Sequence, residues 1–272
     1  MKWLLTGVFV VSMLISTASP SLAAFSTIDV PGASATYALG INNRGQVVGT
    51  YLPSGSTTFH GYVLDHGTFN TIDVPGADHT DCRGINDRGE IVGQYSAGGR
   101  THGYVLENGV FSTIDFPGAS STRAEGINNR GQIVGVYFAG GGIHGFMLYD
   151  STLSTIDVPG ARNTLPFGIN DRGQIVGEYS LGNTHGFVLS NGTFSTIDVP
   201  ASIFTEASGI NNRGQIIGTY QTVDLERGFV FYMGTFSDVD IGFFINTIGF
   251  NDHGQIVGTY QVGDTNHGFL LD

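Results

Sequence analysis

Apolar residues in this chain come in short runs with no helical period. In the first repeat, four β-prone runs follow one another at residues 38–42, 46–51, 60–65 and 68–73. A turn that contains glycine follows the first run and the third run, as in β-hairpins. Val47 and Val48 are adjacent, and so are the apolar residues 62–64. Both faces of these strands are therefore predicted to be buried, as in a sheet packed between two other sheets.

The four runs recur along the whole chain. The decamer GINNRGQVVG at Gly40 has near copies that begin at Gly84, Gly126, Gly168, Gly209 and Gly249. The segments FSTIDVPG at Phe25 and HGYVLD at His60 recur with it, and consecutive copies lie 40 to 44 residues apart. Such a period without helices is typical of the blades of a β-propeller.

The two ends of the chain hold complementary parts of one repeat. The first repeated segment, residues 25–30, matches the outermost strand, and the last, residues 267–271, matches the third strand. If the N-terminal strand completes the last blade, no strand edge stays open. The sequence thus predicts an all-β, six-bladed propeller of four-stranded blades, a single domain over residues 24–272.

The decamer is predicted to be a turn that the fold needs, not a binding loop. Asn-Asn/Asp-Arg-Gly fits a type I turn followed by glycine with positive φ, and Asn or Asp side chains cap such turns. The decamer lacks the Asp-x-Asp-x-Asp spacing and the closing Glu of a calcium loop.

These repeats resemble a known family. GINNRGQVVG, followed some 20 residues later by HGYVL, is similar to the HAF extracellular repeat family, with glycine in place of the alanine of His-Ala-Phe and Arg227 in place of one histidine. The resemblance covers nearly all of residues 24–272. It implies an exported repeat protein, mostly found in bacteria, with no settled activity and no catalytic residues to carry over.

Export is also indicated by residues 1–23. Lys2 precedes an apolar run over residues 3–15, and small residues Ser21 and Ala23 fit a signal-peptidase site after Ala23. The run is too short to span a bilayer, so we expect a secreted or periplasmic protein without membrane insertion.

Charge and cysteine content narrow the possible partners. The chain has 23 acidic residues against 11 basic ones, a balance that disfavours nucleic acid and anionic lipid. Its single cysteine, Cys82, allows no internal disulfide. We expect a monomer whose partner is a small molecule, a carbohydrate or a peptide or protein.

The repeated polar residues are not expected to carry chemistry. The histidines at the start of the third strands and the aspartates of the TID segments lie on outer strands, so their copies diverge around a ring. Each histidine is expected to make a repeated structural hydrogen bond. We therefore expect no metal site, no cofactor and no catalytic residue.

Candidate binding residues lie where the copies disagree. One and three positions before the decamer, at the predicted mouth of the central channel, the copies differ in charge and size. Beside them, two copies are predicted to lack the Pro-Gly turn and to present phenylalanines instead. The candidates are Tyr37, Asp81, Arg83, Arg123, Glu125, Phe167, Phe204, Glu206 and Phe243.

Three functions are compatible with this pattern. The favoured one is an exported, non-enzymatic recognition module with a ligand or partner site at the channel mouth. The alternatives are a structural envelope protein without a ligand, and a carbohydrate-active hydrolase or lyase that uses mouth acids such as Asp81, Glu125 and Glu206. The fold by itself does not separate them.

Overall fold

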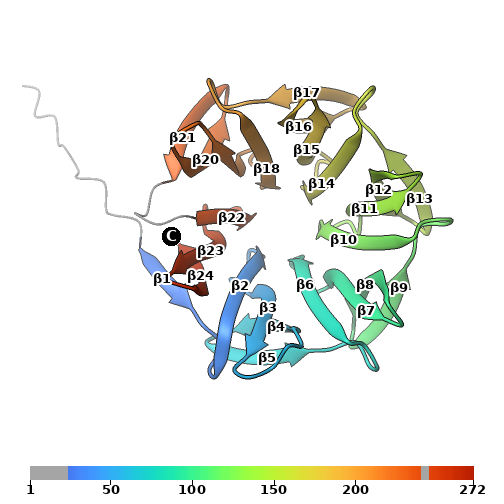
Figure 1. The fold of residues 1–272 in the computed structure, drawn as a ribbon, viewed down its shortest axis with the longest axis vertical. Helices are drawn as coiled ribbons and strands as arrows, with labels where there is room; N and C mark the ends of the chain where they lie inside the picture. The colour runs from blue at the N-terminus through green and yellow to red at the C-terminus, as the bar shows by residue number, and fades with distance from the viewer. Residues whose placement is uncertain (1–23, 240–244) are drawn as a thin grey trace, which may run out of the picture.

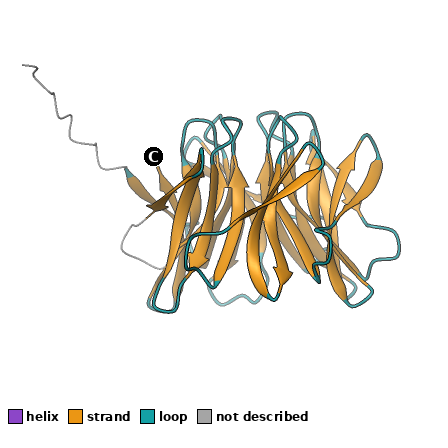
Figure 2. Cartoon of the chain, turned by 90° about the horizontal axis from the view of Figure 1, so that it is seen from above, coloured by secondary structure: helices purple, strands orange, loops and turns teal. Residues whose placement is uncertain are grey.

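The computed structural model describes residues 24–239 and 245–272, and this part of the chain is all-β. Short antiparallel strands are grouped into repeat units that surround a central axis (Figure 1). Seen edge-on, the body is a disc whose loops gather on two opposite faces (Figure 2). No helix occurs in the described ranges, and accordingly none there could cross a membrane. The predicted all-β class is confirmed.

Each repeat unit runs from an inner strand near the axis to an outer strand at the rim. Unit 1 comprises β2 (Ala33–Ile41), β3 (Val47–Pro53), β4 (His60–Asp65) and β5 (Thr68–Ile72). Unit 2 comprises β6 (His79–Ile85), β7 (Ile91–Ala97), β8 (Arg100–Glu107) and β9 (Val110–Ile114). Unit 3 comprises β10 (Ser121–Ile127), β11 (Ile133–Ala139), β12 (Gly142–Tyr149) and β13 (Thr152–Ile156).

The remaining units follow the same order. Unit 4 comprises β14 (Asn163–Ile169), β15 (Ile175–Leu181), β16 (Asn183–Ser190) and β17 (Thr193–Ile197). Unit 5 comprises β18 (Phe204–Ile210), β19 (Ile216–Gln221), β20 (Glu226–Tyr232) and β21 (Thr235–Val239). Unit 6 comprises β22 (Ile245–Phe250), β23 (Ile256–Val262), β24 (Thr265–Leu271) and, from the other end of the chain, β1 (Phe25–Ile28).

Hydrogen bonding divides these units into three four-stranded sheets and one twelve-stranded sheet among the described residues. The twelve-stranded sheet holds units 3, 4 and 5, which are joined only by the single parallel pairs Ile143↔Asn163 and Thr184↔Phe204. Within each unit every pairing is antiparallel. The units are therefore distinct sheets, and a single parallel residue pair joins unit 3 to unit 4 and another joins unit 4 to unit 5.

The two ends of the described chain meet in one sheet. β1 pairs antiparallel with β24, with Phe25 opposite Leu271 and Ile28 opposite Gly268. In Figure 1 the first strand, in blue, lies along the last strands, in dark red. The N-terminal strand thus takes the outer position that the C-terminal repeat leaves vacant.

The hydrophobic core lies between units, not inside them. A fully buried ring from each third strand, Tyr62 in unit 1 and Phe269 in unit 6 among them, packs against apolar residues of the preceding unit. The seam between units 6 and 1 joins Ile28 and Val257 to Ala38 and Tyr62. It therefore brings together residues from both ends of the chain, and burial on both faces of the strands is confirmed.

Two glycines of each decamer are required by this close packing. A Cβ on Gly49 would lie 1.9 Å from the carbonyl oxygen of Tyr37 and 2.9 Å from the Tyr62 ring. A Cβ on Gly40 would lie 2.8 Å from the carbonyl oxygen of Arg83 in the next unit. The clash at Gly49 recurs with a carbonyl oxygen in every other unit, and a Cβ at the counterparts of Gly40 would lie 2.5 to 3.1 Å from the nearest atom. A side chain at either position would therefore push the strands apart.

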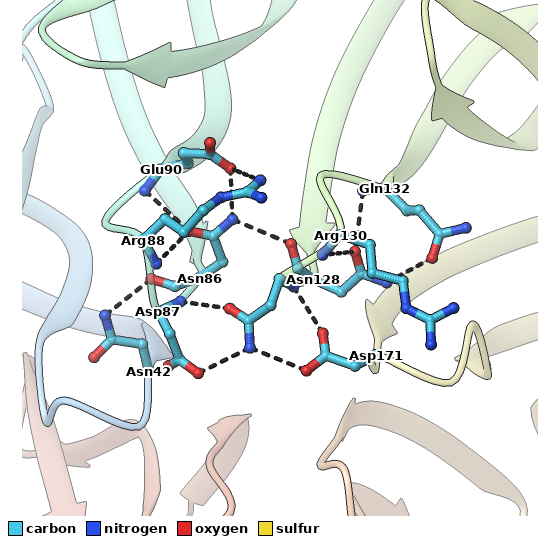
Figure 3. A network of polar contacts seen from close by, with 10 residues as sticks. Asn42, Asn86, Asp87, Arg88, Glu90, Asn128, Arg130, Gln132 and Asp171 are labelled. Carbon is cyan, nitrogen blue, oxygen red and sulfur yellow. Dashed lines mark hydrogen bonds and ion pairs between the residues drawn. The ribbon is translucent and has the colours of Figure 1, made fainter.

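The decamer forms the turn that the sequence predicts. Gly45 has a φ of 76°, and its N–H donates to the carbonyl oxygen of Asn42. The Asn42 side-chain oxygen accepts hydrogen bonds from the backbone N–H groups of Arg44 and Gln46, at 3.0 Å each. Figure 3 shows the same caps in units 2 and 3.

The same turns also connect each unit to the next. The first asparagine of each turn donates its amide N–H to the backbone carbonyl of its counterpart in the following unit, from Asn42 to Asn86 at 3.0 Å and so on. The last of these bonds runs from Asn251 back to Asn42, at 3.1 Å. A circle of hydrogen bonds thus surrounds the axis without a break.

The second turn position forms a further circle in which asparagine and aspartate alternate. Its members, in order, are Asn43, Asp87, Asn129, Asp171, Asn212 and Asp252. Each asparagine amide donates to the carboxylates on both sides, and each backbone N–H donates to the next side chain. Figure 3 shows the section of this circle between Asp87 and Asp171. Each carboxylate therefore accepts three hydrogen bonds, and the circle surrounds one end of the axis.

The repeated histidines make a structural hydrogen bond, as predicted. The partner was not foreseen, because it is the aspartate of the TID segment. His60 Nδ1 donates to the Asp73 carboxylate at 2.9 Å, and His267 does the same to Asp29 across the ends of the chain. Four of the five imidazoles stack on the tyrosine of the second strand, and the fifth lies tilted on it.

One local expectation is wrong. Unit 5 lacks the Pro-Gly sequence, yet its turn keeps the Pro-Gly conformation, because Ala201 adopts a φ of 65° where Gly32 has 81°. The N–H of Ser202 donates to the carbonyl oxygen of Val199, as Ala33 does to Val30 in the first turn. In unit 6 the corresponding residues, Phe243 included, lie outside the described residues.

Candidate ligand pocket at the channel mouth

The end of the axis opposite the Asn/Asp circle carries a pocket of about 610 Å³. It lies off-centre, and units 1, 2 and 6 line it together with the first residue of β20 in unit 5. Its walls mix amide, hydroxyl, charged and aromatic side chains. The lining residues are Tyr37, Leu39, Thr50, Phe59, Asp81, Arg83, Glu226, Asn246, Ile248, Thr259, Tyr260, Gln261 and Asn266. We call this the mouth pocket.

The structure brings three of the predicted site residues together in this pocket: Tyr37, Asp81 and Arg83. Glu125 and Phe167 line a smaller axial cavity of about 80 Å³, which Arg83 also lines. Arg123 is directed elsewhere, with its guanidinium 5.0 Å from the centre of the Phe138 ring.

The two remaining predicted residues that the structure describes lie in unit 5. Phe204 is half-buried at the start of β18, and Glu206 is half-buried two residues later. Neither lines the mouth pocket. Phe243 lies outside the described residues, so the expected aromatic sector is represented here by Phe204 alone.

Asp81 is held in place by neighbours on both sides. Its Oδ1 accepts a hydrogen bond from the Thr50 hydroxyl of unit 1 at 3.2 Å. Its Oδ2 accepts one from the Gln94 amide of its own unit at 2.5 Å. Because both oxygens have a donor, the carboxylate is fixed in position and partly neutralised.

Arg83 stands between two acids. Its Nη1 lies 3.6 Å from Glu125 Oε2, and the Glu125 side chain is only 9% exposed. The charge of Glu125, with a smaller contribution from Asp81, raises the pKa of the Arg83 guanidinium, although burial acts in the opposite direction. The Arg83 Nε atom is buried and has no partner among the described residues.

The aromatic wall comes from unit 1. The Tyr37 and Phe59 ring centroids lie 6.3 Å apart with planes inclined at 58°. The Tyr37 hydroxyl accepts a hydrogen bond from the Asn266 amide at 3.0 Å, which joins units 1 and 6 across the pocket. This wall is therefore oriented by contacts on two units.

Two acids near the mouth hold protons more tightly than usual. Burial, together with the charges of Glu178, Glu125 and Glu226, raises the pKa of Glu206 to about 8. Burial alone raises the pKa of Glu178 to about 7, and its Oε2 has no partner among the described residues. Glu178 was not predicted as a site residue, although it is the one acid among the equivalent second-strand residues.

Several pocket residues were not predicted from the sequence because they lie on the second strands, on the loops that follow them, or at the start of a third strand. Phe59, Gln261 and Asn266 are examples. One signal was available for Phe59: the loop before His60 runs over residues 54–59, whereas only residues 98 and 99 separate β7 from β8 in unit 2. A longer loop on one unit marks an asymmetric face.

Metal ligands are not grouped in the part of the chain that the structure describes. No set of three or more His, Cys, Asp or Glu side chains in residues 24–239 and 245–272 is placed to hold a metal ion. Cys82 is buried in the seam between units 1 and 2, where burial raises the pKa of its thiol to about 12.

Comparison with known proteins identifies the architecture. No known family profile and no curated sequence matches the chain. Among solved structures, a streptogramin B lyase superposes with a TM-score of 0.55 at 14% identity, covering 92% of this chain and 98% of the other. The β-propeller domain of the trilobed protease from Pyrococcus furiosus gives 0.52 at 11% identity, covering 87% and 83%. This chain is a β-propeller.

A third neighbour of this propeller is the PQQ-bound aldose sugar dehydrogenase from Streptomyces coelicolor, with a TM-score of 0.53, 10% identity and coverage of 93% and 99%. These neighbours differ in activity and share little sequence with the propeller described here. The likeness therefore shows the fold alone, and the function has to be argued from the mouth pocket.

Proposed function

We propose that this β-propeller is an exported, non-enzymatic recognition module that holds a ligand in the mouth pocket. The observation that carries the proposal is that the pocket is formed by residues that break an otherwise near-identical repeat. Three positions before the decamer, units 1, 2 and 6 contribute Tyr37, Asp81 and Asn246 to one cavity. A volume of about 610 Å³ falls within the range of small-molecule sites.

The number of blades and the closure of the ring are part of the same proposal. We count six blades, one per decamer, with the N-terminal strand completing the last blade. The pairing of β1 with β24 and the hydrogen bond from Asn251 to Asn42 support closure of the ring. Such a ring would keep the three units around the pocket at fixed distances, so that the site is formed before the ligand arrives.

Export and family membership are proposed from the sequence. Residues 1–23 have the features of a signal peptide, and the decamer with the following His-Gly segment resembles the HAF extracellular repeats. Mass spectrometry of the protein exported from a bacterial host tests the first point. An N-terminus at Ala24 is expected, and retention of residues 1–23 in the exported protein would contradict it.

The hydrogen bonds that Asp81 accepts favour a recognition role over catalysis. Both oxygens of Asp81 accept hydrogen bonds within the protein, which suits a fixed acceptor better than a group that exchanges protons. A carbohydrate-active hydrolase or lyase remains the second candidate, because Glu178 and Glu206 have raised pKa values close to the mouth. Release of product from an oligosaccharide panel, lost in Glu206→Gln, would favour that candidate.

A bulky substitution at the rim of the mouth pocket tests the recognition proposal. Gln261 is exposed at the pocket rim, and Gln221 is its counterpart one unit earlier and does not line the pocket. Ligands of residues 24–272 are first found by a thermal-shift screen of sugars, amino acids, peptides and aromatic compounds. Gln261→Trp is expected to abolish binding of the hit, whereas Gln221→Trp leaves it intact. Equal binding by both variants would place the site elsewhere.

A further inference from the structure

The charged groups of the mouth pocket are largely compensated within the protein. Asp81 receives hydrogen bonds from Thr50 and Gln94, at 3.2 and 2.5 Å. Arg83 faces Glu125 at 3.6 Å, and the carboxylate of Asp81 lies two residues before it on the same strand. A charged ligand would therefore have to compete with existing partners for these groups, which disfavours strong ionic recognition.

The groups left for a ligand are mostly neutral. Amide side chains stand at three points of the lining: Asn246 on β22, Gln261 on β23 and Asn266 on β24. Asn246 Oδ1 accepts a hydrogen bond from the Thr219 hydroxyl at 3.3 Å, and its amide nitrogen has no hydrogen-bond partner among the described residues. Each amide offers donors and acceptors together, the combination that matches hydroxyl groups, which also do both.

One wall of the pocket is apolar and aromatic. The Tyr37 and Phe59 rings form it, and the Asn266 amide anchors the Tyr37 hydroxyl. Facing the interior at the channel side are the side chains of Leu39 and Ile248. A ligand that fills this space needs an apolar face as well as an edge of hydrogen-bonding groups.

From these contacts we propose that the ligand of the mouth pocket is a neutral saccharide, in the size range of a mono- or disaccharide. A sugar ring has an apolar C–H face for Tyr37 and Phe59, and hydroxyls at its edge for Asn246 and Gln261. The exposed carboxylate of Glu226 adds an acceptor for further hydroxyls. This inference rests on the proposed function, since it names the ligand class of the same site.

The test uses residues 24–272 and isothermal titration calorimetry with named probes. Neutral probes are glucose, galactose, N-acetylglucosamine, maltose and cellobiose, and charged probes are glucuronate, glucosamine and trialanine. At least one neutral sugar is expected to bind more tightly than its charged counterpart. Gln261→Ala and Asn246→Ala should each weaken that binding about fivefold, as expected for loss of a hydrogen bond.

Matched controls come from equivalent or distant exposed residues. Gln221→Ala occupies the same strand position one unit earlier, and Asn70→Ala lies on an outer strand. Both should bind the sugar as the parent protein does. Thermal melting of all four variants separates loss of binding from loss of folding, because each substituted side chain is exposed.

Three results would contradict the saccharide inference, and they differ in whether the recognition proposal also fails. If glucuronate, glucosamine or trialanine binds in the pocket and every neutral sugar fails, the inference of a neutral saccharide is wrong while the recognition proposal stands. If no probe binds, the saccharide inference falls, and the wider screen with Gln261→Trp decides the proposed function. If a sugar binds equally well to pocket variants and controls, its site lies elsewhere and both proposals fail.

Discussion

The Asn43 side-chain amide donates a hydrogen bond to the Asp252 carboxylate at 2.9 Å, across 209 positions of the chain. This contact joins the first decamer to the last one. It is one link of the alternating circle at one end of the axis, where each carboxylate lies between two amide donors. Alternation is required because neighbouring carboxylates would repel each other, and neighbouring amides would leave donors facing donors.

Asp252→Asn should destabilise the protein. The substitution replaces a carboxylate that accepts three hydrogen bonds by an amide, whose nitrogen would face the donors of its neighbours. Loss of hydrogen bonds to a charged acceptor costs about 2 kcal/mol of the free energy of unfolding. Urea denaturation measures it, with exposed Asp224→Asn as the control. A loss no greater than that of the control would show that the circle does not stabilise the fold.

Deleting residues 24–28 should lower the melting temperature and promote aggregation. The deletion removes β1, which leaves the edge of β24 unpaired and takes Ile28 out of the seam between units 6 and 1. Differential scanning calorimetry and light scattering, with residues 24–272 as the reference, measure both effects. An unchanged melting curve would mean that the N-terminal strand does not hold the two ends together.

Ala201→Gly should stabilise the protein. Ala201 adopts a φ of 65°, a region in which a Cβ is strained and glycine is not. The release of about 1 kcal/mol of strain is partly offset by the greater freedom of glycine in the unfolded chain. A net gain of about 0.5 kcal/mol in the free energy of unfolding is expected. Ala33→Gly, just after the equivalent turn, is the control and should destabilise.

Stability should fall as the pH rises from about 4.5 to about 8 because of Glu206, whose pKa is raised from 4.5 to about 8. In this window the folded protein holds a proton that the unfolded chain has released, so raising the pH favours unfolding. The groups that face Glu206 are Glu178, Glu125 and Glu226, all acidic, so repulsion adds to the effect.

Melting temperatures measured between pH 5 and pH 9 check this linkage. Glu206→Gln should flatten the decline seen in the parent protein, since glutamine cannot ionise. Exposed Glu107→Gln should keep the parent profile. Parallel profiles for parent and Glu206→Gln would show that the Glu206 carboxyl titrates normally in the folded protein.

Local repetition determined much of the architecture. The period, the adjacent apolar residues and the Asn-Arg-Gly turns predicted β-hairpins buried on both faces, and Gly45 has the positive φ that this turn requires. The alternation of Asn43 with Asp87 and its successors is also visible in the sequence. Its meaning is not, because a circle of side chains exists only when the turns of all the units converge on one axis.

The same distinction holds for the histidines. A repeated hydrogen bond could be expected from a repeated residue, but its partner could not. His60 begins β4 and Asp73 directly follows β5, and the hairpin register of these two strands brings them together. Ala201 gives the converse case. Its sequence suggested a lost turn, whereas Ala201 keeps the positive φ in spite of its Cβ, and the turn keeps the hydrogen bond from the Ser202 N–H to the Val199 carbonyl oxygen.

By itself, the sequence determined the strands, the turns and the positions at which the copies differ, because these depend on short-range periodicity and backbone preference. Only the tertiary structure decided which differing positions share a cavity. Tyr37 lies near the start of the chain and Asn266 near its end, yet they meet because β1 joins β24 and unit 6 packs on unit 1. The mouth pocket depends on that long-range packing, which no local pattern encodes.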